Sequence, residues 1–366
     1  IYTQVEQLNK TALKSHGLDS NGQLYKINSF EFYRYEDIIK KEDDAGYDKT
    51  AFEKMLEIKG DSDHTKLIDM LTDLNDYSIG IEDVLKEHFD EENIIYWMAF
   101  QILMGNVDTQ NRNVYLYSPL NSDIWYFIAW DNDTCLMRPE YELRNFSDQN
   151  SWEKGISNYW GNILFQRCLK SRPFREKLND AILDLREYLN KDMLTSKIES
   201  YKNVLKPYLY SMPDAEYEPL TSEQYDQIAA SLPDEIEKNY QLYLESLETP
   251  MPFYIGVPSI DGDKLKFNWD VSYDLDAEDI TYSVEVARDY LFRDVIYQNT
   301  TLTVPEAEMD LPEAGQYFVR VRATNTSGKT QDAFDYYVTD EGKHYGMKCF
   351  YITEDNTVEE DIYEEG

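Results

Sequence analysis

The segment from Gly105 to Asp133 constrains the fold more than any other part of the sequence. It reads GNVDTQNRNVYLYSPLNSDIWYFIAWDND, with two runs rich in β-branched and aromatic residues, 114–117 and 124–130, on either side of a polar turn. This pattern predicts a β-hairpin. An antiparallel hairpin places the start of its first strand beside the end of its second strand. The polar residues at these two outer ends should therefore meet.

Four polar side chains lie at those outer ends: Asp108, Asn113, Asp131 and Asp133. Three carboxylates and an amide on apolar strands are costly to bury unless they bind something, and a divalent cation suits such oxygen donors. The same order of groups occurs in kinase-like phosphoryl transfer, where one Asp orients the acceptor hydroxyl and the later groups hold metal on the phosphates. The simpler alternative is a polar connection into a strand, because Asp and Asn are common in turns.

The sequence on both sides of this hairpin predicts mainly helices. The preceding helix, predicted over 93–104, is apolar on nearly every side and should be buried, and Gly105 should end it. We expect a strand over 1–8, a helix over 10–16, a short strand over 23–26 and helical spacing over 51–76. After the hairpin we expect an irregular segment over 138–159 and then helices over 163–169, 174–189, 193–209 and 222–247, with breaks at Pro173 and Pro233.

The pattern changes after a boundary at Thr249-Pro-Met-Pro. Short alternating strands follow, separated by turn residues, and about ninety residues of this kind predict a small β-sandwich. Trp269 and the sequence YFVRVRATNTSG over 317–328 resemble fibronectin type III modules. Residues 354–366 are acidic and should form a solvated tail. The strands are expected over 265–269, 282–287, 301–304, 317–323 and 335–338.

Composition and motif content exclude several classes of protein. Lys plus Arg number 35 against 71 Asp plus Glu, and the net charge of −36 repels nucleic acid and anionic membrane surfaces. No apolar run approaches the ~20 residues that a membrane span requires. The three cysteines are far apart and include no C-x-x-C pair, which argues against a disulfide framework or a zinc site. The four histidines are scattered and no serine elbow is present, which argues against a zinc hydrolase or a catalytic triad.

The chain resembles the CotH family of kinase-like proteins, first associated with bacterial spore coats. The resemblance covers about residues 1–250 and implies an atypical protein kinase fold that uses ATP with Mg²⁺ or Mn²⁺ to phosphorylate serine in a protein substrate. Its most diagnostic part is the block from Asp108 to Asp133. The motifs that carry it are Tyr2-x-x-x-Glu6, Leu24-Tyr25-Lys26, Gly105-Asn106-x-Asp108-x4-Asn113-x-Tyr115-Leu116-Tyr117 and Trp130-Asp131-x-Asp133.

The resemblance also implies roles for individual residues. Asp108 would be the catalytic-loop acid, Asn113 and Asp131 would be metal ligands, and Asp133 would be a second ligand or a structural acid. Glu6 would lie at the hinge beside adenine, although a Glu at the end of a strand is as often merely exposed.

The phosphate-binding half of the site is incomplete in this sequence. The upstream N-terminal lobe of the family, with its phosphate-gripping basic residue, is absent, so we expect the chain to begin inside a domain. No Gly-rich loop or Walker pattern replaces it. Lys26 is a candidate phosphate contact, against the simpler expectation of a solvated charge. Three arginines near the site are further candidates, with ordinary ion pairing as their alternative: Arg112, Arg138 and Arg144.

These inferences combine into one expected architecture of the α+β class. An atypical protein-kinase-like domain, mostly its helical C-lobe with an incomplete N-lobe, should occupy 1–250. A fibronectin type III-like sandwich over 251–340 and an acidic extension over 341–366 should follow. The expected substrate is a serine-rich protein, with basic character as one option, and the sandwich is a candidate for binding a cell-wall or surface component. The expected location is extracellular, on the cell surface or in the spore coat of a bacterium.

The glycosylation sequon Asn132-Asp133-Thr134 favours a bacterial source, because a glycan there would block metal binding. Two other functions stay open at this point. One is a catalytically inactive pseudokinase or a calcium-binding surface scaffold. The other is a two-carboxylate glycosidase built on Asp131 and Asp133, since sandwich modules often accompany carbohydrate enzymes.

Overall fold

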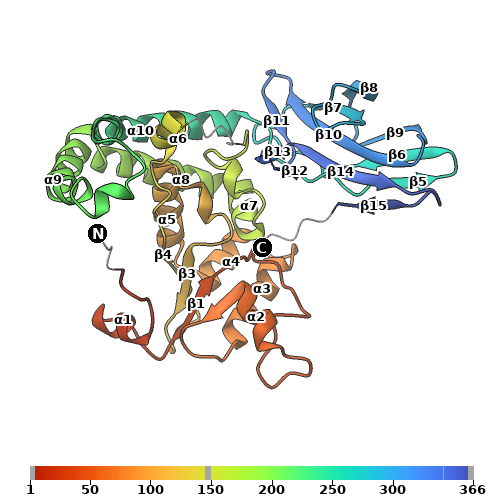
Figure 1. The fold of residues 1–366 in the computed structure, drawn as a ribbon. Coiled ribbons are helices and arrows are strands. Elements are labelled where there is room, and N and C mark those ends of the chain that lie inside the picture. Colours follow the sequence, from red (N-terminus) through yellow and green to blue (C-terminus); the bar gives the residue numbers. More distant parts are fainter. Residues whose placement is uncertain (1–4, 145–149, 341, 362–366) are drawn as a thin grey trace. The chain divides into compact units, whose positions relative to one another are not determined.

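The computed structural model describes residues 5–144, 150–340 and 342–361 of the chain. Its contacts divide the chain into two compact units. The N-terminal unit comprises residues 1–146 and 159–242, and the C-terminal unit comprises residues 147–158 and 243–366. The first is mainly helical and the second is built of antiparallel strands, which confirms the predicted α+β class (Figure 1). No described helix combines the length and hydropathy needed to cross a bilayer.

Ten α-helices and three 3₁₀ turns are present among the described residues. The α-helices are α1 (Lys10–Ser15), α2 (Lys49–Met55), α3 (Thr65–Asn75), α4 (Ile81–His88), α5 (Glu91–Met104), α6 (Arg138–Arg144), α7 (Ile163–Lys170), α8 (Arg172–Tyr188), α9 (Lys191–Leu209) and α10 (Ser222–Glu248). The 3₁₀ turns are η1 (Val107–Thr109), η2 (Ser157–Tyr159) and η3 (Asp214–Glu216).

In the described part of the N-terminal unit, four strands form an antiparallel sheet in the order β2-β1-β3-β4. The predicted hairpin is confirmed as β3 and β4, which pair from Val114 opposite Ala129 to Tyr117 opposite Tyr126. Helix α5 is buried on most of its circumference, as predicted, and packs against β4 and α8 (Figure 1). The strands are β1 (Gln23–Ile27), β2 (Leu56–Ile58), β3 (Val114–Ser118) and β4 (Tyr126–Ala129).

Several local predictions for this unit were wrong. Residues 5–8 form no strand, and residues 1–4 lie outside the described part of the chain. The helical spacing over 51–76 is interrupted by β2, which pairs with β1 and so satisfies its backbone groups in the sheet. The segment after the hairpin contains α6, in which Arg144 pairs with Glu140 one turn earlier. Pro233 lies inside the continuous α10 instead of breaking it.

A buried histidine joins β1 to α2 and α3 in this unit. His64 is fully buried, its Nδ1 lies 2.8 Å from the Tyr25 hydroxyl, and its ring stacks on Phe52 at 4.2 Å. Burial lowers the pKa of His64, although Glu42, Asp63 and Asp61 favour its charged form.

This histidine should make the N-terminal unit sensitive to mild acid. Below the ordinary histidine pKa of 6.5 the unfolded chain takes up a proton at His64 that the folded chain does not, so the contribution of His64 to stability is lost as pH falls. We expect His64→Gln to melt with a shallower dependence on pH between neutrality and mild acid than the wild type, measured by thermal denaturation across that range. His16→Gln, a change at an exposed histidine, serves as the control, and equal slopes for wild type and His64→Gln would contradict the assignment.

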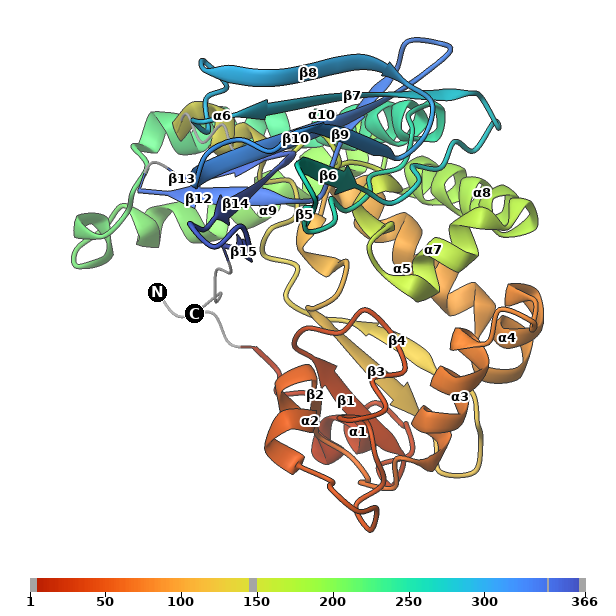
Figure 2. The same cartoon turned by 90° about the vertical axis from the view of Figure 1, so that its right-hand side faces the viewer.

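The described residues of the C-terminal unit form three antiparallel sheets. The six-stranded sheet runs β15-β14-β10-β7-β8, a three-stranded sheet runs β5-β6-β9, and β12 pairs with β13 (Figure 2). The sixth strand of the large sheet, β11, pairs with β10. Its core includes Trp269, Val284, Val321 and Phe350. The strands are β5 (Ser259–Asp261), β6 (Lys264–Asn268), β7 (Ile280–Ala287), β8 (Val295–Leu302), β9 (Glu306–Asp310), β10 (Gly315–Asn325), β11 (Thr330–Asp332), β12 (Tyr336–Thr339), β13 (Gly342–Tyr345), β14 (Met347–Ile352) and β15 (Val358–Glu360).

The strands therefore continue beyond residue 340, into the segment for which an acidic extension was expected. β14 lies beside β10 inside the large sheet, and β15 pairs with β14 although it belongs to the predicted solvated tail. Residues 362–366 of that tail lie outside the described residues. The sheet-rich unit is consistent with a sandwich, and its fibronectin type III-like character stays a prediction.

Candidate functional site

The candidate site begins where α5 ends. Gly105 adopts a left-handed conformation (φ 62°) that ends the helix, and a Cβ atom there would lie 2.7 Å from the Nδ2 of Asn239. The buried Asn106 follows and caps η1 by accepting a hydrogen bond from the Asp108 backbone N–H. Asp108 thus lies in a short, firmly anchored turn directly after a buried helix.

Both carboxylate oxygens of Asp108 are engaged by its own loop. Arg112 donates from Nε to Oδ1 at 2.8 Å, and Asn113 donates from Nδ2 to Oδ2 at 2.8 Å. The Asp108 side chain is 28 % exposed and that of Arg112 is 52 % exposed. Arg112 can therefore leave the carboxylate for solvent or a ligand, while Asn113 holds it from the strand side.

Asn113 and Asp131 meet at the same end of the hairpin. They lie just beyond the last paired residues, Val114 and Ala129, and both have left-handed backbones, with φ of 58° and 52°. Asn and Asp tolerate this conformation better than other residues with a side chain. Left-handed backbone conformations of residues other than glycine are a form of local strain, and such strain is common at functional sites.

The donor atoms at this end suit a hard cation. Because Asn113 gives its amide N–H to Asp108, its Oδ1 is left to accept, and no described residue donates to it. Asp131 and Asp133 are exposed, and neither makes a hydrogen bond or ion pair with a described side chain. No group of three or more His, Cys, Asp or Glu residues in the described segments is arranged to hold a metal. The oxygen donors that the sequence predicts for a divalent ion at this end are one amide and two carboxylates, and their role as metal ligands stays a prediction.

A polar network behind the site joins its two halves, and sequence reasoning missed it. Asn106 donates to Asn132 Oδ1 at 3.2 Å and to Gln101 Oε1 at 3.0 Å, and its own Oδ1 accepts from the Thr134 hydroxyl at 2.6 Å. Gln101 also donates to Asn132 Oδ1, at 3.1 Å. The network fixes the loop carrying Asp108 relative to the segment carrying the two later acids.

A second set of contacts supports the loop from the other side. Glu31 accepts from Asn111 Nδ2 through Oε1 and from the Tyr35 hydroxyl through Oε2, each at 2.7 Å. Asn162 donates to the Gln110 carbonyl at 2.9 Å. No sequence signal marked Glu31, since it lies between two buried phenylalanines in an irregular segment.

The two predicted nucleotide contacts lie at different distances from this centre. Lys26 is on β1 and pairs with Tyr115 on β3. Tyr115 follows Asn113 by two residues, so Lys26 and Asn113 are separated by roughly 7 Å along the strand direction. Its ammonium group makes no ion pair or hydrogen bond with a described residue. Glu6 lies outside the sheet, and its carboxylate is 2.8 Å from His16 Nε2. Lys26 thus lies on the strand next to the one that follows Asn113, whereas Glu6 lies against α1.

The remaining reactive side chains nearby are occupied or inert. Arg138 pairs with the buried Glu235 at 2.9 Å and Arg144 pairs with Glu140 at 2.8 Å, in line with the ordinary ion pairing considered for them. Burial raises the pKa of Cys135 to about 12, although a hydrogen bond with Asn106 acts in the opposite direction. That thiol is neutral at physiological pH and is no nucleophile.

Comparisons with known proteins identify the family of the chain. No curated protein matches the chain. Among solved structures, the surface layer protein SbsC, domains 1–6, is 12 % identical with a TM-score of 0.15; the match covers 90 % of this chain but only 41 % of that one, and so low a score carries no argument. The family described as CotH kinase protein matches residues 1–243, which is more than half of the chain and includes all six predicted site residues. The chain belongs to the CotH kinase protein family.

Proposed function

We propose that this chain is an atypical protein kinase that transfers the γ-phosphate of ATP to a serine hydroxyl. The observation that carries the proposal is the hydrogen bond from Asn113 to Asp108 at the end of the hairpin where Asp131 also lies. An acid that orients the acceptor and two oxygen ligands for metal are the parts that phosphoryl transfer needs. Family membership supports a kinase-like activity, and the finer roles below are part of the proposal.

Asp108 accepts the proton of the serine hydroxyl as the oxygen attacks the γ-phosphorus. The new O–P bond forms while the bond to the bridging oxygen of ADP breaks. Asn113 and Asp131 would hold Mg²⁺ or Mn²⁺, with Asp133 as a second ligand or a support for the first. When bound, the metal neutralises charge on the phosphate oxygens. Lys26, on β1, would contact the phosphates of ATP. Glu6 would lie beside the adenine ring.

Charge and family membership support a substrate class and a location. A chain with a net charge of −36 attracts basic segments, so we propose a serine-containing protein of basic character as the phosphate acceptor. The spore coat association of CotH proteins supports a spore coat or bacterial surface location. The C-terminal unit is assigned to binding a wall or surface component.

Metal-dependent nucleotide binding is the direct test. Asp131→Asn should weaken Mn²⁺-dependent ATP binding by at least about tenfold, because a neutral amide replaces a charged ligand. Calorimetry with the whole chain and ATP, with and without Mn²⁺, measures this. Asp123→Asn, at an exposed carboxylate in the turn at the other end of the same hairpin, is the matched control and should bind as the wild type does.

Two results would defeat the proposal. One is a wild-type chain that binds no ATP with either Mg²⁺ or Mn²⁺. The other is calcium binding without any nucleotide binding, which would select the surface scaffold instead.

A further inference from the structure

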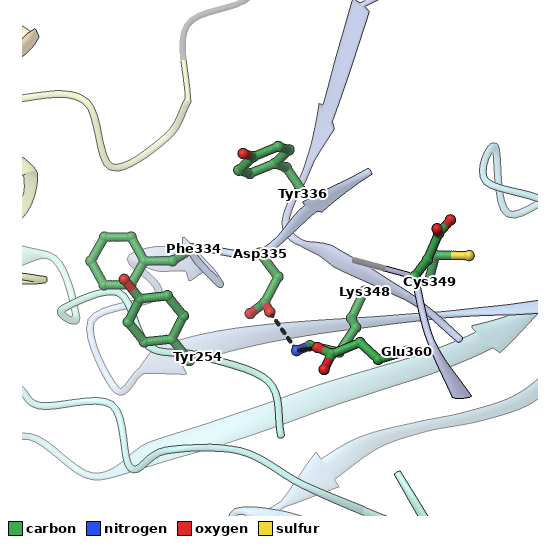
Figure 3. Close-up of a pocket in the computed structure, with 8 residues that line it drawn as sticks. Tyr254, Phe334, Asp335, Tyr336, Lys348, Cys349 and Glu360 are labelled. Carbon is green, nitrogen blue, oxygen red and sulfur yellow. Dashed lines mark hydrogen bonds and ion pairs between the residues drawn. The ribbon is translucent and has the colours of Figure 1, made fainter. Parts of the chain in front are cut away.

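The C-terminal unit contains an open pocket of about 210 Å³ that the proposed kinase reaction does not use. Residues from three strands and the loops beside them line it, and Figure 3 shows them as sticks. The volume is below the roughly 300–1,000 Å³ of sites for drug-sized ligands. It therefore fits a single ring or side chain of a larger ligand. The lining residues that bear on its chemistry are Tyr254, Phe334, Asp335, Tyr336, Lys348, Glu360 and Asp361.

One wall of the pocket is aromatic. Tyr254 and Phe334 lie with ring centroids 4.8 Å apart and planes 33° apart, and Trp152 supports Phe334 edge-on at 5.0 Å. Tyr254 is 52 % exposed, so a large part of it is left uncovered. Figure 3 places Tyr336 on another side of the same space. The wall offers an apolar surface backed by a packed ring.

The floor is a row of alternating charges. The Lys348 ammonium lies 3.2 Å from Asp335 Oδ1 and 2.6 Å from Glu360 Oε1 (Figure 3). Burial raises the pKa of Asp335, and the two carboxylates hold the pKa of Lys348 above its ordinary value against the effect of burial. Burying such a row is costly, and its contribution to stability is small or negative compared with apolar residues of similar size.

The backbone holds this row in place. Asp335 Oδ2 accepts from the Ile255 N–H at 2.7 Å, and its carbonyl accepts from Gly346 at 2.7 Å. Lys348 lies on β14, which is paired on both sides, with β10 and with β15, and Glu360 ends β15. The donors and acceptors of the floor are therefore fixed before any ligand arrives, which lowers the ordering cost of binding.

The chemistry of the two surfaces excludes most ligands. An anion would face the carboxylates of Asp335, Glu360 and Asp361, and a cation would face the Lys348 ammonium that lies between Asp335 and Glu360. A neutral ligand with hydroxyl groups matches the row, because each hydroxyl both donates and accepts a hydrogen bond. A pyranose ring has such hydroxyls at its edge and C–H groups on its face, and the face suits the Tyr254 wall.

We infer that this pocket binds one pyranose ring of a neutral glycan, stacked on Tyr254 with its hydroxyls on the row from Asp335 to Glu360. Binding involves no cleavage. The inference does not depend on the kinase proposal, since every lining residue belongs to the C-terminal unit.

The test uses the full chain and four neutral hexasaccharides: cellohexaose, chitohexaose, mannohexaose and maltohexaose. At least one should bind in calorimetry, and Tyr254→Ala should weaken that binding by about tenfold or more while Tyr254→Phe retains it. Tyr273→Ala, at another exposed tyrosine of the unit, is the control and should not change the affinity. Thermal melting checks that Tyr254→Ala leaves the fold intact.

A fully deacetylated chitohexaose separates a sugar site from a cation site, because it carries the same backbone with ammonium groups. If this cationic hexamer binds tightest and Glu360→Gln abolishes its binding, the pocket recognises cations and the inference is overturned. It is equally overturned if none of the four neutral sugars binds, or if Tyr254→Ala binds as well as the wild type.

Discussion

A chain carrying Asp108→Asn should bind ATP and Mg²⁺ as the wild type does and yet transfer phosphate about 10²–10⁴ times more slowly. The amide keeps the size of the carboxylate and still presents an oxygen to Asn113, but it cannot accept the proton of the incoming hydroxyl. The fold should be unaffected, since the ion pair with Arg112 is largely exposed and such pairs contribute at most about 1 kcal/mol. Transfer from ATP to a synthetic serine–lysine repeat peptide measures the rate.

Arg112→Gln is the matched control for this experiment. It removes the same ion pair but leaves the Asp108 carboxylate and the hydrogen bond from Asn113 in place. We expect this variant to keep most of the transfer rate. If Asp108→Asn transfers at the wild-type rate, Asp108 is not the catalytic acid. If both variants lose activity equally, the ion pair matters and the carboxylate has no separate role.

The sequence predicted the frame of the site because its signals are local. Alternation and turn residues define the hairpin of β3 and β4, and the apolar circumference of α5 predicts its burial. The pairing of Val114 with Ala129 then places Asn113 and Asp131 together, as expected. Each of these inferences uses residues fewer than thirty positions apart.

The parts that the sequence did not predict depend on distant partners. Asn106 looks like a helix stop in the sequence, and only the fold brings Asn132 and Thr134 to it. The short strand β2 pairs with β1 across thirty residues and carries too few residues to show a strand period. β15 has the composition of a solvated tail, and it is a strand because β14 offers it an edge.

A buried ion pair connects the segment that follows the hairpin to α10, and we expect its removal to have a large effect. Arg138 donates from Nη1 to Glu235 Oε2 at 2.9 Å and from Nη2 to Asn239 Oδ1 at 2.7 Å. The Glu235 side chain is 1 % exposed. Asn239 donates in turn to the Leu103 carbonyl at 2.9 Å. Its side chain also lies so close to Gly105 that a Cβ atom there would be 2.7 Å from Asn239 Nδ2. Arg138 therefore links the end of α5, the acidic segment and α10.

Arg138→Met should lower the stability of the N-terminal unit by about 3 kcal/mol, because it leaves a buried carboxylate whose remaining charged partner is Lys238. Urea denaturation followed by circular dichroism measures the loss. The rate of amide hydrogen exchange over residues 132–144 should rise in the same variant, because this segment loses its contacts with Glu235 and Asn239 of α10. Arg144→Met, on the same helix, removes a partly exposed i,i+4 pair with Glu140 and should change stability by less than about 0.5 kcal/mol.

Adding Glu235→Leu to Arg138→Met separates the cost of an unpaired charge from the value of the pair. Replacing both partners with apolar residues of similar size is often neutral or stabilising, and Lys238 is exposed enough to turn to solvent. The double variant should therefore regain most of the stability that Arg138→Met loses. If the exchange over 132–144 stays high in the double variant while stability returns, the ion pair specifically fixes this segment. If the double variant is no more stable than Arg138→Met, the loss comes from the hydrogen bond to Asn239, and the buried charge is not its cause.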